Sequence, residues 1–188
     1  MPRRPRTAAA GLLIFALAAT LAGCSDTTRI PDPTPEATAD PLFASDEEAL
    51  AAAVEVYKEF LAVSDQILQE GGEQPERLEP LVSAELYESE LTGFQNFASS
   101  GARLVGSSTI TVSELQQRAP GAESGTEEVI AYFCVSSEET DVVDASGASI
   151  REPGAPVEYA FEVVTAFAPD SAVIESNQLF DGLQSCGD

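Results

Sequence analysis

The segment from Glu127 to Ser136, EEVIAYFCVS, decides the fold class of this chain. It is rich in Val, Ile, Phe and Tyr, the residues that favour β-strands. Similar segments recur after Gly101 with an apolar period of about two, and turn residues such as Pro120-Gly121 separate them. We therefore expect strands over Arg103 to Leu115, Glu127 to Ser136, Val157 to Ala168 and Ala172 to Phe180.

Before Gly101 the apolar residues recur at helical spacing. Ser45 followed by Glu48 fits a capping box, which predicts the start of a first helix, and Gly71-Gly72 predicts its end. Its apolar stripe comprises Leu50, Ala53, Val54, Tyr57, Phe60, Leu61, Ser64, Ile67 and Leu68. The side chains expected to face water are Glu55, Lys58, Glu59, Asp65 and Gln69.

Two more helical regions follow. One begins near Pro75 and breaks around Pro80, and the other runs from Ser83 to Gly101. The last helix carries a stripe formed by Leu86, Tyr87, Glu90, Leu91, Phe94 and Phe97. Helices followed by strands predict an α+β domain, with the helices packed on one face of an antiparallel sheet.

The composition excludes several functions. The chain has 188 residues, with 32 Asp and Glu against 9 Lys and Arg, no His, and a net charge of −23. Such acidity excludes nucleic acid as a partner, because binding to phosphates depends on Lys and Arg replacing counterions. The absence of His excludes Ser-His and Cys-His nucleophile pairs and most zinc sites. We therefore expect neither a cofactor nor a metal.

The amino end predicts export. Arginines at positions 3, 4 and 6 precede an apolar run from Ala8 to Leu21, which is shorter than a membrane-spanning helix. The exit Leu21-Ala22-Gly23-Cys24 resembles the lipobox of bacterial lipoproteins, which implies that Cys24 receives a diacylglycerol and becomes the first residue of the mature chain. Ordinary secretion, with cleavage after Ala16-Leu17-Ala18, is the alternative.

These features divide the chain into three parts. Residues 1–23 are expected to be a lipoprotein signal peptide, and residues 24–44 a Pro- and Thr-rich tether with extended conformation. Residues 45–188 are expected to form a single α+β domain, which carries the whole excess of acid. We therefore expect a protein anchored by lipid on the extracytoplasmic face of the cell membrane.

The cysteines agree with an exported domain. Once Cys24 is lipidated, Cys134 and Cys186 remain, and an even pair in an oxidising compartment predicts a disulfide. The bridge would contribute roughly 4 kcal/mol by restricting the unfolded chain. Two free buried thiols are the alternative.

The three helices followed by a long antiparallel sheet, from about Asp46 to Cys186, resemble the nuclear transport factor 2-like superfamily, whose fold is a cone formed by helices and a curved sheet. The stretch Ala131-Tyr132-Phe133-Cys134-Val135 and its continuation to Asp144-Ala145-Ser146-Gly147 are similar to a hairpin of actinobacterial lipoproteins. The resemblance implies a pocket between sheet and helices. Candidates to line it for a small apolar ligand are Tyr57, Phe60, Tyr87, Phe94, Phe97, Tyr132 and Tyr159, although core packing explains the same residues.

Two groups of acidic residues are candidates for a catalytic or a metal site. An isomerase-like site needs a carboxylate beside a hydroxyl donor, and Glu158 or Glu162 would supply the carboxylate if turned inward. Their alternation with Tyr159, Phe161 and Val163 favours the solvent face. The acids from Glu138 to Asp144 lack the EF-hand spacing for calcium, so they predict a charged hairpin tip.

The function expected from these features is binding, of an apolar ligand or an envelope protein, and not catalysis. An isomerase or dehydratase acting on a small hydrophobic substrate is the alternative. A homodimer through the open face of the sheet is a further alternative.

Overall fold

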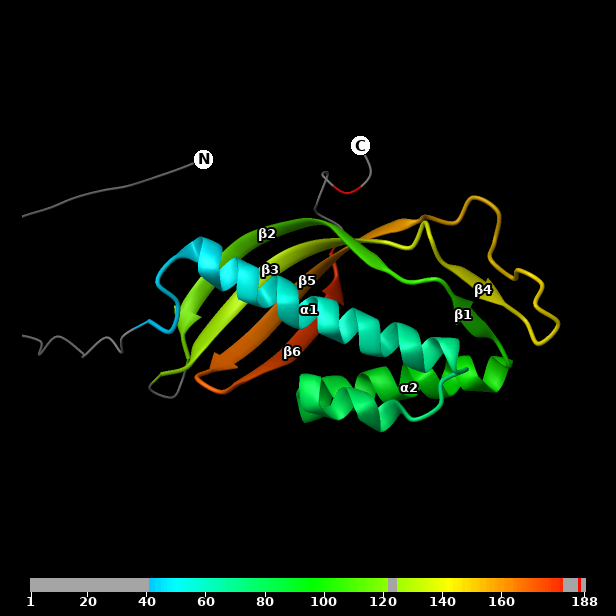
Figure 1. Cartoon of the computed structure of the whole chain (residues 1–188), viewed down its shortest axis with the longest axis horizontal. Helices are drawn as coiled ribbons and strands as arrows, with labels where there is room; N and C mark the ends of the chain where they lie inside the picture. Colours follow the sequence, from blue (N-terminus) through cyan, green and yellow to red (C-terminus); the bar gives the residue numbers. More distant parts are fainter. Residues whose placement is uncertain (1–40, 122–124, 181–185, 187–188) are drawn as a thin grey trace, which may run out of the picture. The chain divides into compact units, whose positions relative to one another are not determined.

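Three helical segments precede six strands in the computed structural model, which describes residues 41–121, 125–180 and 186 (Figure 1). Cys24, the expected signal peptide and most of the expected tether lie outside the described residues. The elements are α1 (Asp46–Gln69), the 3-10 helix η1 (Pro75–Leu81), α2 (Ala84–Ser100), β1 (Arg103–Val105), β2 (Thr109–Pro120), β3 (Glu127–Ser136), β4 (Asp141–Val143), β5 (Glu158–Ala168) and β6 (Ser171–Leu179).

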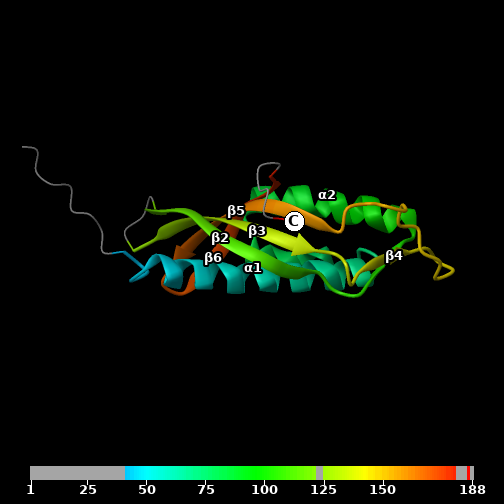
Figure 2. The same cartoon turned by 90° about the horizontal axis from the view of Figure 1, so that it is seen from above.

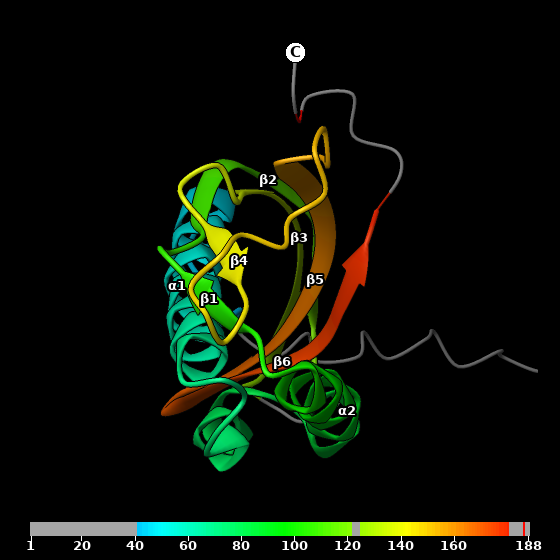
Figure 3. The same cartoon turned by 90° about the vertical axis from the view of Figure 1, so that its right-hand side faces the viewer.

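The main sheet is antiparallel, with the strand order β2-β3-β5-β6. Seen from its end, the sheet forms an arc with α1 on its concave side and α2 near β6 (Figure 3). The expectation of an α+β fold with helices against an antiparallel sheet is thus confirmed. A separate ribbon of β1 and β4 lies near the carboxyl end of α1, away from the start of this helix (Figure 2).

The first expected strand is divided in two. Gly106 separates β1 from β2 with a left-handed φ of 84°, and a Cβ at this position would lie 1.9 Å from the carbonyl oxygen of Glu139. Only glycine allows the two backbones to approach so closely. The backbone at Glu139 therefore packs against this bend. The next segment, β4, pairs with β1, and periodicity did not predict this strand.

The helices begin and end at the residues that the sequence indicates. The Ser45 hydroxyl accepts a hydrogen bond from the Glu48 amide at 3.2 Å, while the Glu48 carboxylate accepts from the Ala44 amide, one residue before the expected partner. At the other end, the Gly72 amide donates to the Ile67 carbonyl at 2.8 Å, which closes α1 in a Schellman turn.

The core lies between α1 and the concave side of the sheet. The Tyr57 ring stacks on Phe133 of β3, with centroids 4.5 Å apart, and on Phe60 at 5.6 Å. On β3 every second residue from Glu127 to Val135 is buried, as expected for a strand with one covered face. The opposite face of the sheet is partly exposed, except at Cys134, which forms the expected disulfide with Cys186.

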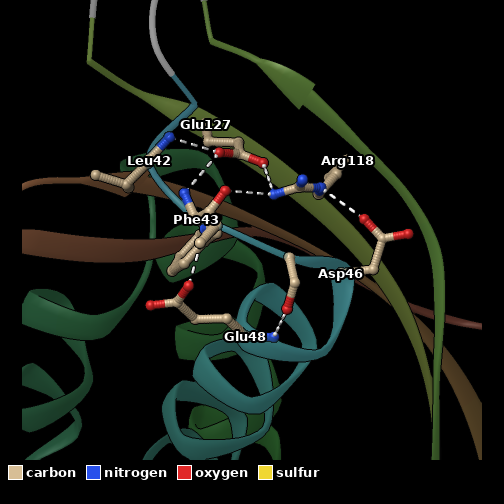
Figure 4. Close-up of polar contacts among 8 residues, drawn as sticks. Leu42, Phe43, Asp46, Glu48, Arg118 and Glu127 are labelled. Carbon is tan, nitrogen blue, oxygen red and sulfur yellow. Dashed lines mark hydrogen bonds and ion pairs between the residues drawn. The ribbon is translucent and has the colours of Figure 1, made fainter.

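Contacts with the folded unit begin before Ser45, at Leu42 and Phe43. The Glu127 carboxylate, 4% exposed, accepts hydrogen bonds from the amides of Leu42 and Phe43 at 2.9 and 3.2 Å (Figure 4). Arg118 donates to the Phe43 carbonyl and to Glu127, both at 3.0 Å, and also pairs with Asp46. These contacts hold the chain that enters α1 and position the Phe43 ring in the core.

Among the described residues no helix is long and apolar enough to span a membrane.

Candidate functional site

A cavity of about 450 Å³ lies between α1 and the loop that leads from β1 into β2. This volume falls within the range of small-molecule sites. Its lining combines polar groups with an apolar surface and includes Lys58, Leu61, Asp65, Gln69, Ser108 and Ile110.

Asp65 is the buried carboxylate of this cavity, with 5% of its surface exposed. It accepts two hydrogen bonds from Ser108, from the amide at 2.6 Å and from the hydroxyl at 3.0 Å. Burial raises the pKa of Asp65, and the two hydrogen bonds from Ser108 oppose the rise. The expectation that Asp65 faces water is therefore wrong, because a loop distant in sequence covers this turn of α1.

The loop over Asp65 is held by a second contact. The Gln69 side-chain amide donates to the Gly106 carbonyl at 2.7 Å. This bond joins the last turn of α1 to the bend at Gly106, beside the cavity. At its other end, the ammonium group of Lys58 pairs with Glu55 at 2.7 Å. The cavity thus presents a carboxylate, an ammonium group and amide groups over an apolar floor, an arrangement suited to a small polar ligand.

A second polar cluster lies between α1, α2 and β6. The buried Tyr57 hydroxyl donates to Asn177 Oδ1 at 3.1 Å, and Asn177 also hydrogen-bonds the Glu90 carboxylate. Burial raises the pKa of Glu90, and the Asn177 contact opposes the rise. Burial and the charge of Glu90 raise the pKa of Tyr57 far above its ordinary value, so the phenol stays protonated.

Asn177 connects this cluster to the surface. It forms part of the wall of a cavity of about 390 Å³ between α2 and β6, with Glu85 and Glu175 among the other lining residues. Tyr57 is 1% exposed, and its ring packs against Phe60 and Phe133. The phenol therefore reaches the wall of this cavity through the side-chain amide of Asn177.

The seven aromatic pocket candidates do not gather around one cavity. Tyr57, Phe60 and Phe94 are buried in the core, and Tyr87 and Phe97 are half-buried on α2. Tyr159 is 38% exposed and donates to the Pro156 carbonyl. Tyr132 lies on the face of the sheet away from the helices, stacked on Phe180 with centroids 4.5 Å apart. None of the seven lines the cavity beside Asp65.

The acids of β5 lie on the face of the sheet that the alternation of polar and apolar residues predicts. Glu158 and Glu162 alternate with core-facing residues such as Val163, so they lie on the face of the sheet away from α1. In the hairpin, hydrogen bonds from Ser146 and the Ala148 amide lower the pKa of Asp144, whose carboxylate closes the turn. Within the described part of the chain, no three His, Cys, Asp or Glu side chains gather to hold a metal.

The sequence did not predict roles for Asp65, Ser108 and Asn177. Asp65 and Ser108 are 43 residues apart, and Asn177 is 120 residues from its partner Tyr57. Glu90 gave the one available signal, because it interrupts an otherwise apolar helical stripe.

The fold and cavity define the class of protein as an α+β domain with α1 on the concave side of an antiparallel sheet, α2 beside β6 and a partly buried polar cavity. No family model matches the chain, and no curated protein matches it. Among solved structures it is similar to the intermembrane space region of the chloroplast protein ARC6, with a TM-score of 0.50 and 10% identity over 70% of this chain and 95% of the other. This likeness concerns the fold alone.

Proposed function

We propose that the chain is a bacterial lipoprotein, anchored through Cys24 on the extracytoplasmic face of the cell membrane, whose domain binds a ligand or another envelope protein without catalysing a reaction. The cavity beside Asp65 carries the binding part of this proposal, since it has the volume of a ligand site and polar groups that converge on it.

Lipid anchoring is supported by the order of an arginine-rich start, a short apolar run and Leu21-Ala22-Gly23-Cys24. Globomycin, which inhibits the lipoprotein signal peptidase, should cause the unprocessed precursor to accumulate. Cys24→Ala should abolish lipid labelling and shift the protein out of the membrane fraction. A variant that stays in the membrane fraction would contradict the assignment.

Ligand binding can be tested by filling the cavity. Ala62 lies in the cavity wall and is exposed, so Ala62→Phe should occupy the space without disturbing the core. Ala51→Phe is the matched control, because Ala51 is an exposed alanine of α1 outside this wall. Ligand-observed NMR with a mixture of small amines, acids and sugars should give binders that Ala62→Phe loses and Ala51→Phe keeps. Identical binding by both variants would remove the cavity from the proposal.

We also propose that the domain belongs to the nuclear transport factor 2-like cones. Support comes from three helical segments that precede the strands and from the arc of the sheet around α1. An experimental structure with a different strand order would contradict this assignment.

The second candidate function is isomerase or dehydratase chemistry, favoured by the chain of contacts from Tyr57 through Asn177 to Glu90. Enolisation requires a carboxylate base and a hydroxyl donor. Glu90, whose pKa is raised, and the Tyr57 phenol both hydrogen-bond the side-chain amide of Asn177. Turnover of a β,γ-unsaturated ketosteroid, followed by absorbance of the conjugated product, would test this class of substrate. Activity that Glu90→Gln and Tyr57→Phe abolish would favour catalysis, while absence of turnover would count against it.

A further inference from the structure

The face of the sheet opposite α1 carries a row of side chains from all four strands. Glu114 of β2 lies opposite Tyr132 of β3, Tyr132 lies opposite Glu162 of β5, and Glu162 lies opposite Gln178 of β6. Directly paired residues point to the same side of a sheet, so these four side chains share one face. We call this surface the outer face; it also includes Val112, Ile130, Cys134, Val164 and Phe180.

Of the described helices, α1 lies on the other side of the sheet, and α2 borders this face at β6, where Gln178, Glu85 and Ser89 line one cavity. α1 contacts β2, β3 and β6, and its buried residues belong to the same core as alternate β3 residues such as Val129 and Phe133. The side chains on the other side of β3, Ile130 and Tyr132, are half-buried. The described side chains on the convex side of the arc (Figure 3) thus form a mixed apolar and acidic surface, in which Cys134 is buried and bonded to Cys186.

The charge on the outer face has one sign. Glu114 and Glu162 flank Tyr132 on its two neighbouring strands, and the phenol hydrogen-bonds Glu162. Desolvation raises the pKa of Tyr132, and both carboxylates add to the rise, which indicates that their charges act on the same ring.

The cations of the domain lie elsewhere. Four of them lie on α1, on η1, on β1 and in the loop before β5: Lys58, Arg77, Arg103 and Arg151. The fifth, Arg118, pairs with Glu127 and Asp46 at the core side of the sheet. Within the described residues, therefore, no Lys or Arg neutralises Glu114 and Glu162 on the outer face.

We infer that the outer face is a docking surface for a basic segment of another envelope protein, with a Lys or Arg side chain of that segment seated beside Tyr132 between Glu114 and Glu162. Charge complementarity selects this occupant. The stacked rings of Tyr132 and Phe180 offer an aromatic surface to the same cation, and Val112, Ile130 and Val164 offer contacts to its apolar neighbours.

A second copy of the chain is disfavoured by the same charges. A two-fold interface through this face would bring the carboxylates of both copies together, and each chain carries a net charge of −23. The inference depends on the proposed extracytoplasmic location in one respect, namely that the partner is an envelope protein. It does not depend on the cavity beside Asp65.

The test uses the full-length chain in detergent and a fluorescein-labelled octa-arginine peptide as the probe, with fluorescence anisotropy as the readout. The double variant Glu114→Gln/Glu162→Gln should weaken binding by about fivefold or more, since it removes both charges from the outer face. The control Glu59→Gln/Glu88→Gln removes the same charge from exposed positions on α1 and α2, and it should stay within about twofold of the original affinity.

Tyr132→Leu provides a second variant that keeps apolar bulk and every charge. It should weaken octa-arginine binding by about twofold to fivefold, because the aromatic contact with the cation is lost. Ala62→Phe should leave this binding unchanged, which separates the outer face from the cavity beside Asp65. Equal losses in the two double variants would show that the peptide senses only net charge, and would overturn the inference. Light scattering that shows a dimer, abolished by Glu114→Gln/Glu162→Gln, would overturn it in favour of a second copy.

Discussion

The carboxylate of Asp65 accepts hydrogen bonds from both the amide and the hydroxyl of Ser108, at 2.6 and 3.0 Å. The two residues are 43 positions apart in the chain. This pair joins the middle of α1 to the loop before β2 and forms part of the wall of the candidate ligand cavity.

Loss of the Asp65 carboxylate should therefore loosen the loop. Asp65→Ala is expected to lower the free energy of unfolding by about 1–3 kcal/mol, since the Ser108 donors lose their acceptor. Urea unfolding measures this change, and hydrogen exchange at the Ser108 amide should accelerate in the variant. Ser108→Ala, which removes one of the two bonds, should cost less. Additive effects of the two substitutions in the double variant would contradict a direct coupling between these side chains.

Removal of Glu127 should be more costly. Glu127→Ala leaves the amides of Leu42 and Phe43 without their acceptor and leaves Arg118 without its buried partner. We expect a loss of about 3 kcal/mol in urea unfolding, together with faster proteolysis before α1. The control is Glu55→Ala, whose ion pair with Lys58 is exposed and should contribute less than about 1 kcal/mol. An equal loss of free energy of unfolding in the two variants would contradict a stabilising role for the contacts of Glu127 with Leu42, Phe43 and Arg118.

The raised pKa values of Asp65 and Glu90 predict a pH dependence of stability. The folded protein binds protons on these groups more tightly than the unfolded chain, whose ordinary values are near 3.8 and 4.5. The free energy of unfolding should therefore fall as the pH rises through the raised values in the folded state. Asp65→Asn/Glu90→Gln should flatten this decline in urea unfolding at a series of pH values. The control Glu59→Gln/Glu88→Gln removes the same net charge from exposed positions and should leave most of the slope unchanged.

The disulfide between Cys134 and Cys186 should stabilise the domain through the unfolded chain. The cysteines are 52 residues apart, so Cys186→Ala is expected to cost about 4 kcal/mol by the chain-entropy relation. Thermal unfolding with and without a reductant measures the effect. Reductant should lower the melting temperature of the original protein and leave that of Cys186→Ala unchanged. A melting temperature insensitive to reductant in both would contradict this prediction.

Gly106 should tolerate no side chain. A Cβ at this position would meet the Glu139 carbonyl oxygen at 1.9 Å, and the backbone has a left-handed φ. Gly106→Ala should therefore lower stability by about 1–3 kcal/mol. The control Gly147→Ala has a similar φ of 83° but open space around the added methyl group, so it should cost less. Circular dichroism followed during urea unfolding would distinguish the two variants.

Local pattern predicted the helices and most of the strands of this protein, although it missed β4 and the division of the first expected strand at Gly106. The caps at Ser45 and Ser83, the turn at Gly71-Gly72 and the bounds of β3 follow from residues near one another in the chain, because their hydrogen bonds span only a few residues. The pairing of Cys134 with Cys186 was also predicted from the sequence, because the expected lipidation of Cys24 left one partner for each of the other two cysteines.

Tertiary structure alone decided which polar groups are buried. Asp65 occupies a helix position that periodicity assigns to solvent, yet the loop containing Ser108 covers it. Tyr132 belongs to an apolar strand, yet its parity places it opposite the helices and beside two carboxylates from neighbouring strands. Helical and strand periods describe the face of one element, whereas burial depends on what another element brings to that face. The sequence therefore predicted the helices, most strands and the disulfide, whereas the packing of distant segments determined the β1-β4 ribbon, the cavity and the outer face.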